Sequence, residues 1–184
     1  MNVSTLCLAV LSTGDAAGYD IRKHVTEGVY SHFLDASFGS IYPALSRMET
    51  DQLVTSRTET TAGKPARKVY SITEEGRDAF LEALHRPIRK DVYRSEFLLL
   101  AMFAAHLQPA HVRAAIDAQL AFLRSEIETI DETAASIESP AAHWVADCGR
   151  VCIQHNIDYI EARRGELEAL AGTELGDPLP LAAE

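Results

Sequence analysis

The sequence has few of the residues that would cross-link a small secreted fold or anchor a chain in a bilayer. It holds three cysteines among 184 residues. That is an odd number in a chain long enough to bury a core, so a disulfide framework is not expected. No apolar run approaches the ~20 residues that span a membrane. The short apolar run at 6–11 has no basic residues before it, which argues against a signal peptide. We therefore expect a cytoplasmic protein.

Motifs of the common enzyme classes are also missing. The sequence has no glycine-rich phosphate loop, no nucleophile elbow and no histidine pair of a metal hydrolase. Its acidic residues are spread along the expected helices, as is typical of solvent-exposed faces. We expect no catalytic residues, no enzyme activity and no cofactor.

The net charge of −10 is unevenly distributed. Residues 1–73 contain seven Lys and Arg against seven Asp and Glu, whereas residues 74–184 contain ten against twenty. The acidic second part is unsuited to lie on DNA or on an anionic membrane. The first part is neutral overall and has local basic clusters.

The segment 39–53 has the pattern of an amphipathic helix. Ile41, Leu45 and Met48 recur at i, i+4 and i+7, which places them on one stripe. Ser40 is the expected N-cap, and Pro43 would then fall in the first turn, where its missing N–H costs nothing. The opposite side carries Ser40, Pro43, Arg47 and Thr50, with Tyr42 on its flank. An ordinary surface helix explains this pattern, but a helix with such a face is also suited to the major groove of DNA.

The surrounding segments favour the DNA-binding interpretation. Two helices are expected before it, at 4–12 and 16–29, with Asp15 as a candidate cap of the second. Two stretches after it, 53–58 and 68–73, are rich in β-branched residues, and Gly and Pro lie in the loop between them. Three helices followed by a hairpin is the order of a winged helix-turn-helix, in which the third helix reads bases and the wing grips phosphates. The tip of this wing would carry Lys64, followed by Arg67 and Lys68.

The rest of the chain predicts an all-helical second domain. Thr73 is the expected cap of a helix that runs to about His85, and a further helix is expected over 91–106. The next segment, 109–139, has a heptad-like seam: Val112, Ile116, Leu120, Leu123, Ile127, Ile130, Ala134 and Ile137. The last helix is expected over 141–170, with these residues inward: Trp144, Cys148, Val151, Tyr159, Leu167 and Leu170. Since an antiparallel hairpin of two such helices cannot bury both apolar faces, we expect it to pack across a homodimer.

These segments define the expected fold class and domains. The chain is predicted to be mostly α with a small β-hairpin (α+β). A winged helix-turn-helix DNA-binding domain should occupy 1–86, a helical dimerisation and effector domain 87–172, and a flexible tail 173–184.

Three motifs resemble one known family. They are residues 8–11 followed by Gly18-Tyr19-Asp20-Ile21, the segment Gly39 to Glu49, and the segment Arg67 to Arg77. In this order and at these separations, residues 6–82 resemble the N-terminal domain of the PadR family of transcriptional regulators. The C-terminal half is similar in length and helical character to the longer members of the family.

The resemblance implies a dimeric winged-helix protein, usually a repressor, that a small effector releases from a near-palindromic operator. The effector is phenolic in some members. DNA contacts of the family would correspond here to Ser40, Tyr42, Arg47, Lys64, Arg67 and Lys68. Among these, Arg47 is best suited to a base, because its fork matches guanine O6 and N7. The sequence departs from the family pattern at Ala16-Ala17 and in the loop 60–66, which carries only one lysine.

The effector site is a separate hypothesis. Between the two halves of a dimer, four aromatic residues would stack a planar, aromatic or hydrophobic ligand, and two histidines would orient its polar groups. The residues are Tyr93, Phe97, Trp144 and Tyr159, with His143 and His155. For each of them, ordinary core packing is the alternative.

Two other functions remain open at this point. Cys148, Cys152 and His155 lie at i, i+4 and i+7, a spacing that suits zinc, copper or an oxidant sensor. Core packing of small residues also explains that spacing. The second is a winged-helix protein-interaction module without DNA binding. The basic cluster of Lys64, Arg67 and Lys68 argues against such a module, whereas the net charge of −10 is compatible with it.

Overall fold

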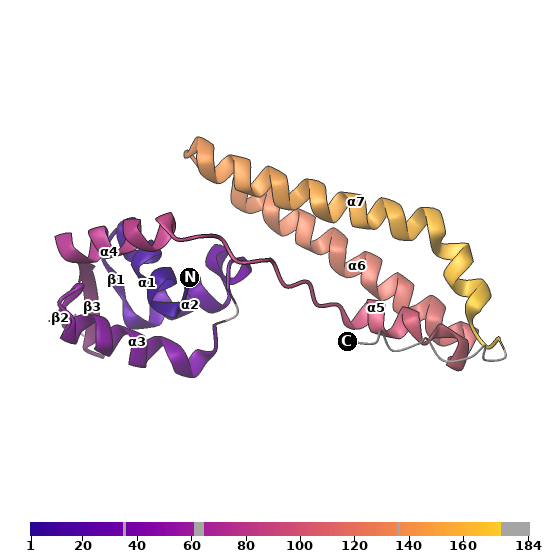
Figure 1. The fold of residues 1–184 in the computed structure, drawn as a ribbon, viewed down its shortest axis with the longest axis horizontal. Coiled ribbons are helices and arrows are strands. Elements are labelled where there is room, and N and C mark those ends of the chain that lie inside the picture. The colour runs from indigo at the N-terminus through magenta and orange to yellow at the C-terminus, as the bar shows by residue number, and fades with distance from the viewer. Residues whose placement is uncertain (35, 61–64, 136, 174–184) are drawn as a thin grey trace. The chain divides into compact units, whose positions relative to one another are not determined.

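The computed structural model describes residues 1–34, 36–60, 65–135 and 137–173. The chain divides into two compact units, Met1–Lys90 and Asp91–Glu184, which are described separately (Figure 1). Within the described residues, no helix is both long and apolar enough to cross a bilayer.

Three helices form the core of the first unit. They are α1 (Val3–Ser12), α2 (Gly18–Thr26) and α3 (Phe38–Thr50), with a short 3-10 turn, η1 (Val29–His32), before α3. The Asn2 side chain accepts a hydrogen bond from the Thr5 amide and caps α1. The buried side chains include those expected inside: Leu6, Val10, Leu11, Ile21, Val25, Ile41, Leu45 and Met48.

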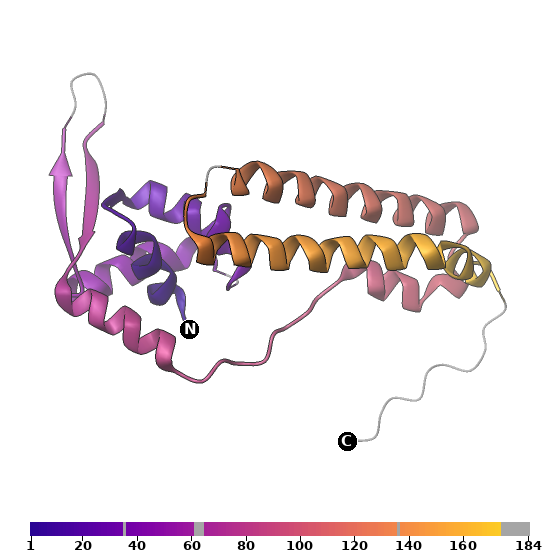
Figure 2. The same cartoon turned by 90° about the horizontal axis from the view of Figure 1, so that it is seen from above.

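A small antiparallel sheet completes this unit. Its strands are β1 (Ala16–Ala17), β2 (Val54–Glu59) and β3 (Arg67–Ile72), in the order β1-β3-β2. Figure 2 shows β2 and β3 side by side. In their register, Arg57 lies opposite Val69. The predicted hairpin is confirmed, but the prediction that a helix begins at residue 16 is wrong. Ala16 and Ala17 pair instead with Tyr70 and Val69, and the helix begins only at Gly18.

Helix α4 (Glu74–His85) follows β3 and has the predicted bounds and cap. The Thr73 hydroxyl accepts from the Gly76 amide at 3.0 Å and donates to the Leu53 carbonyl at 2.9 Å. A Cβ atom on Gly76 would lie 2.0 Å from the Leu53 carbonyl oxygen. Only glycine therefore lets α4 begin this close to the end of α3.

The second unit is a helical hairpin with a short helix packed on it. Its elements are α5 (Glu96–Met102), η2 (Ala104–His106), α6 (Pro109–Ala134) and α7 (Pro140–Leu170). Figure 1 shows α6 and α7 side by side. The first half of the predicted heptad-like seam is confirmed by the burial of Val112, Ile116, Leu120 and Leu123. The later positions are only partly buried, and the helix predicted to reach residue 139 ends at Ala134, before Ile137. The helix predicted over 91–106 is shorter than expected, because Ser95 caps α5 and the chain before it is extended.

The predicted inward face of the last helix is mostly wrong. Leu167 packs against the core of this unit, and so do Ile153, Ile157 and Ile160. The other predicted inward residues are exposed: Trp144, Cys148, Val151, Tyr159 and Leu170. The helix has two apolar faces, and only one of them meets α6.

Candidate nucleic-acid interface

Helix α3 presents one buried and one exposed face, as the sequence predicted. Ile41, Ala44, Leu45 and Met48 are buried against α1, α2 and the sheet. The exposed residues are small, polar or aromatic: Gly39, Tyr42, Pro43, Ser46, Arg47 and Thr50. Most side chains on this face are small, and one of them carries a guanidinium. A helix with such a face can enter a major groove.

The start of α3 differs from the prediction. The helix begins at Phe38, so Ser40 lies inside its first turn and is not the N-cap. Its hydroxyl donates to the Ser37 carbonyl at 2.6 Å, and the side chain is half-buried. Pro43 is therefore the sixth helical residue and cannot donate to the Gly39 carbonyl.

Tyr42 is held in place by the start of α2. A Cβ atom on Gly18 would lie 3.1 Å from Tyr42 Cε1, so the ring rests directly on that glycine. The side chain remains 46% exposed. Gly18 thus positions an aromatic side chain at the edge of the exposed face.

Arg47 lies on the exposed face near the end of α3 and makes no ion pair with any residue that the structure describes. The helix ends just after it, where the Asp51 amide donates to the Arg47 carbonyl at 2.8 Å and Gln52 adopts a φ of 59°. The fork of Arg47 is therefore available for an external partner.

The basic residues of the wing, in contrast, are paired. Lys68 Nζ lies 2.7 Å from Glu49 Oε2, and the Ser56 hydroxyl donates to Glu49 Oε1 at 2.5 Å. The bond from Lys68, followed by that from Ser56, holds the pKa of Glu49 below its ordinary value. Glu49 belongs to α3, so these contacts tie the wing to the exposed helix.

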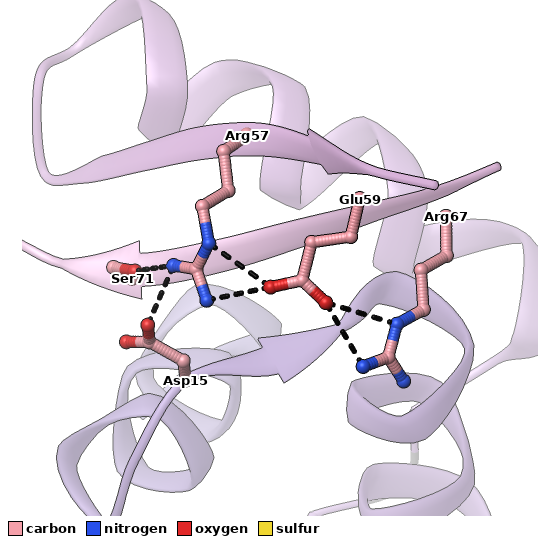
Figure 3. Close-up of polar contacts among 5 residues, drawn as sticks. All are labelled: Asp15, Arg57, Glu59, Arg67 and Ser71. Carbon is pink, nitrogen blue, oxygen red and sulfur yellow. Dashed lines mark hydrogen bonds and ion pairs between the residues drawn. The ribbon is translucent and has the colours of Figure 1, made fainter. Parts of the chain in front are cut away.

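A second group of charges joins β1, β2 and β3 (Figure 3). Arg57 Nη1 lies 2.6 Å from Asp15 Oδ2, and Arg57 Nη2 lies 2.8 Å from Glu59 Oε1. The other oxygen of Glu59 lies 2.9 Å from Arg67 Nη2. Bonds from Arg67 and Arg57 lower the pKa of Glu59, and the bond from Arg57 lowers that of Asp15. The role of Arg57 was not predicted, and the prediction of Asp15 as a helix cap is wrong, because the two partners lie 42 positions apart in the chain.

These pairs change the electrostatics expected of the wing. Each cation is matched by a carboxylate, so the described part of the wing carries little net positive charge. All the pairs are exposed, and such pairs are worth only about 0–1 kcal/mol. A phosphate can therefore displace the carboxylates at small cost. Lys64, the remaining predicted DNA contact, lies outside the described residues.

The predicted effector residues are divided between two places on the helical unit. Asn156 Nδ2 of α7 donates to Tyr93 Oη at 3.5 Å, and Phe97 packs against the core of this unit. His155 and Tyr159 are exposed on the same part of α7 as Asn156. His143 and Trp144 lie about twelve residues earlier on the same helix, roughly 18 Å away along its axis. One protomer therefore does not bring all six residues together.

The cysteine hypothesis receives no support. Within the described residues, no group of three or more His, Cys, Asp and Glu is placed to hold a metal ion. Cys148, Cys152 and His155 are exposed on α7, whereas Cys7 is buried in the first unit. Burial raises the pKa of the Cys7 thiol to about 12.

Comparison with known proteins finds a family model that matches the N-terminal part of the chain. Residues 7–82 match the model of the transcriptional regulator PadR-like family. They include the second half of α1, all of α2 and α3, the three strands and most of α4. The N-terminal part of the chain is therefore similar to the PadR-like family. The resemblance stated from the sequence motifs is confirmed.

Relatives extend the likeness beyond the matched domain. The negative transcriptional regulator PadR of Bacillus subtilis is 32% identical over 102 residues, which are 54% of this chain and 55% of that protein. A PadR-like regulator from Bacillus cereus superposes with a TM-score of 0.75 at 28% identity, over 91% of this chain and 99% of the other. Bacillus subtilis PadR solved with operator DNA has the same fold, with a TM-score of 0.72 at 23% identity over 89% and 98% of the two chains. The chain thus aligns with about half the length of its curated relative, whereas the whole fold is shared with the solved structures.

Proposed function

We propose that this PadR-like protein is a homodimeric, sequence-specific DNA-binding regulator of transcription that acts in the cytoplasm. The observation that carries the proposal is the exposed face of α3, where Arg47 forms no ion pair with a described residue and lies beside a wing of weakly paired cations. In helix-turn-helix complexes the second helix of the motif enters the major groove. Arg47 would read a guanine edge, and Ser40, Tyr42, Lys64, Arg67 and Lys68 would hold phosphates.

The exposed apolar residues of the second unit support the homodimer. Several large side chains of α5, of its C-cap Phe103 and of α7 are about half exposed or more: Leu98, Leu99, Met102, Phe103, Trp144, Val151 and Tyr159. A surface of this kind usually marks a protein interface. A two-fold dimer formed through it would present two α3 helices to successive major-groove faces of a near-palindrome, about 34 Å apart.

Repression and its release are proposed from the relatives. The curated relative is a negative regulator, and a structure of Bacillus subtilis PadR contains p-coumaric acid. Here the aromatic group formed by Tyr93, Phe97 and Tyr159 would receive a small aromatic or hydrophobic effector, with His155 beside it. In the dimer, Trp144 and His143 of either protomer would complete that site.

A mobility-shift titration tests the DNA-binding proposal. The intact protein is titrated against a duplex from its own promoter region and against a scrambled duplex, at low and moderate salt. Tighter binding to the promoter duplex at both salt concentrations is expected, with a weaker overall affinity at higher salt. Equal affinity for both duplexes would contradict sequence-specific recognition and favour a purely electrostatic contact.

A further inference from the structure

Arg22 of α2 lies between two aromatic rings from two different helices. Its guanidinium carbon is 4.7 Å from the centre of the Tyr19 ring and 4.0 Å from the centre of the Phe38 ring. Tyr19 lies on the same helix, and Phe38 is the first residue of α3. These two cation–π contacts restrict the position of the guanidinium, and its N–H edge remains able to donate hydrogen bonds.

That edge has no partner in the described chain. Arg22 Nε is buried without a hydrogen bond, and no ion pair joins Arg22 to a described carboxylate. The three wing cations differ, because each of them pairs with a carboxylate. Within the described residues, no carboxylate compensates the charge of Arg22, although its side chain is only half-buried.

The position of Arg22 indicates what that acceptor is. Phe38 and Tyr42 are one turn apart on the same flank of α3, and Tyr42 rests on Gly18 at the start of α2. Tyr19 and Phe38 are 58% and 50% exposed. Arg22 therefore belongs to a surface that borders the exposed face of α3 on the side of α2. When the second helix of such a motif enters the major groove, the first crosses the DNA backbone.

We propose that Arg22 binds a DNA backbone phosphate at the edge of the groove that α3 enters, with Tyr19 and Phe38 as positioning residues. The inference rests on the proposed function and adds a contact outside both α3 and the wing. A phosphate suits the site because a planar fork donates to two of its oxygens at once. Such a contact anchors the helix and carries no sequence information.

A salt-dependent titration of Arg22→Gln tests this proposal. Fluorescence anisotropy of the intact protein is measured with promoter and scrambled duplexes at four salt concentrations. We expect a loss on the order of tenfold at low salt on both duplexes. The slope of log K against log salt should fall by about 0.9, the value for one phosphate. The ratio of the two affinities should stay unchanged.

Two further variants sharpen the test. Arg77→Gln makes the same charge change on an exposed residue of α4 and should leave the slope unchanged. Phe38→Leu keeps the Arg22 charge but removes one ring, so a smaller loss is expected. A circular-dichroism melt checks that each variant is folded.

The outcomes separate the two proposals. If the wild type prefers the promoter duplex and Arg22→Gln keeps the wild-type slope, the Arg22 contact is wrong and the proposed function stands. If Arg22→Gln changes the sedimentation behaviour instead, the acceptor is a carboxylate of a second copy, which also overturns the contact. If the wild type binds neither duplex, both proposals fail.

Discussion

The two units of this protein bury their apolar residues to very different extents. The first unit, residues 1–90, has a continuous core of helices and sheet, in which side chains such as Ile21, Leu45 and Met48 are almost fully covered. The second unit has one buried seam between α6 and α7 and leaves a second apolar surface open. Their charges differ as well: the first has eleven basic and eleven acidic residues, and the second six and sixteen. The first unit buries its apolar residues within one chain, whereas the second leaves an apolar surface for the proposed second copy, and its acidic charge is unsuited to DNA.

Thiol reactivity should give the largest difference between the units. Burial raises the pKa of the Cys7 thiol to about 12, so at pH 8 only about one such thiol in 10⁴ is ionised. Cys148 and Cys152 are exposed. We expect a thiol reagent followed by mass spectrometry to label the exposed pair at least ~10³-fold faster than Cys7. Labelling of Cys7 at a similar rate in the native protein would mean that the first unit opens readily.

A charge on the open apolar surface should break the dimer. Leu99 of α5 is 58% exposed, and a carboxylate there would be desolvated in the interface. We expect Leu99→Glu to weaken self-association at least about 100-fold in sedimentation equilibrium. Leu99→Met keeps the apolar volume and should associate like the wild type. An unchanged dimer in Leu99→Glu would show that this surface is not the interface.

Replacing one glycine by alanine should lower the unfolding free energy of the first unit and raise that of the second. Gly76→Ala would force a Cβ atom against the Leu53 carbonyl, so we expect the first unit to lose about 1–3 kcal/mol of unfolding free energy. Gly165→Ala in α7 meets nothing within 4 Å and should stabilise its helix by roughly 0.5–1 kcal/mol. Hydrogen exchange of the intact chain, followed peptide by peptide, reports the two effects separately. Faster exchange in α6 and α7 of Gly76→Ala would mean that the units unfold together.

Neutralising one wing carboxylate should have the smallest effect. Glu59→Gln removes the acceptor shared by Arg57 and Arg67 and leaves both freer for phosphates. We expect DNA affinity to rise about threefold on promoter and scrambled duplexes alike. Glu82→Gln makes the same charge change within an ion pair of α4 and should not alter binding. Weaker binding by Glu59→Gln would mean that the carboxylate aligns the cations.

The pH dependence of the same pairs has a definite sign. The pKa of Glu59 is lowered in the folded protein, so its contribution to stability is fully present above the ordinary value of 4.5. That contribution is lost as the pH falls through the lower, folded-state pKa. Carbon-13 NMR of the Glu59 carboxyl should therefore show a midpoint below 4.5. A midpoint at or above the ordinary value would contradict the pairing shown in Figure 3.

Local patterns in the sequence predicted the features that local physics determines. The stripe of α3, the hairpin and the Thr73 cap follow from residues within a few positions of one another. The missed features depend on distant partners. Ala16 and Ala17 form a strand only because β3 lies beside them, and Asp15 meets Arg57 across 42 positions of the chain.

The buried face of α7 also could not be predicted from the local sequence pattern. Its residues are apolar on two faces, and periodicity alone does not say which face meets α6. Trp144 and Tyr159 were predicted inward but are exposed, whereas Ile157 and Ile160 fill the seam. Folding of a single chain leaves the first pair uncovered, which is why a second copy enters the proposal.

The most direct test of the account is the effect of Arg47→Ala on sequence preference. Anisotropy titrations at one salt concentration compare promoter and scrambled duplexes, with Arg77→Ala as the charge-matched control. The account predicts that Arg47→Ala loses about 1–3 kcal/mol on the promoter duplex and much less on the scrambled one. Equal losses on both duplexes would show that Arg47 only neutralises phosphates, and that the exposed face of α3 does not read the sequence.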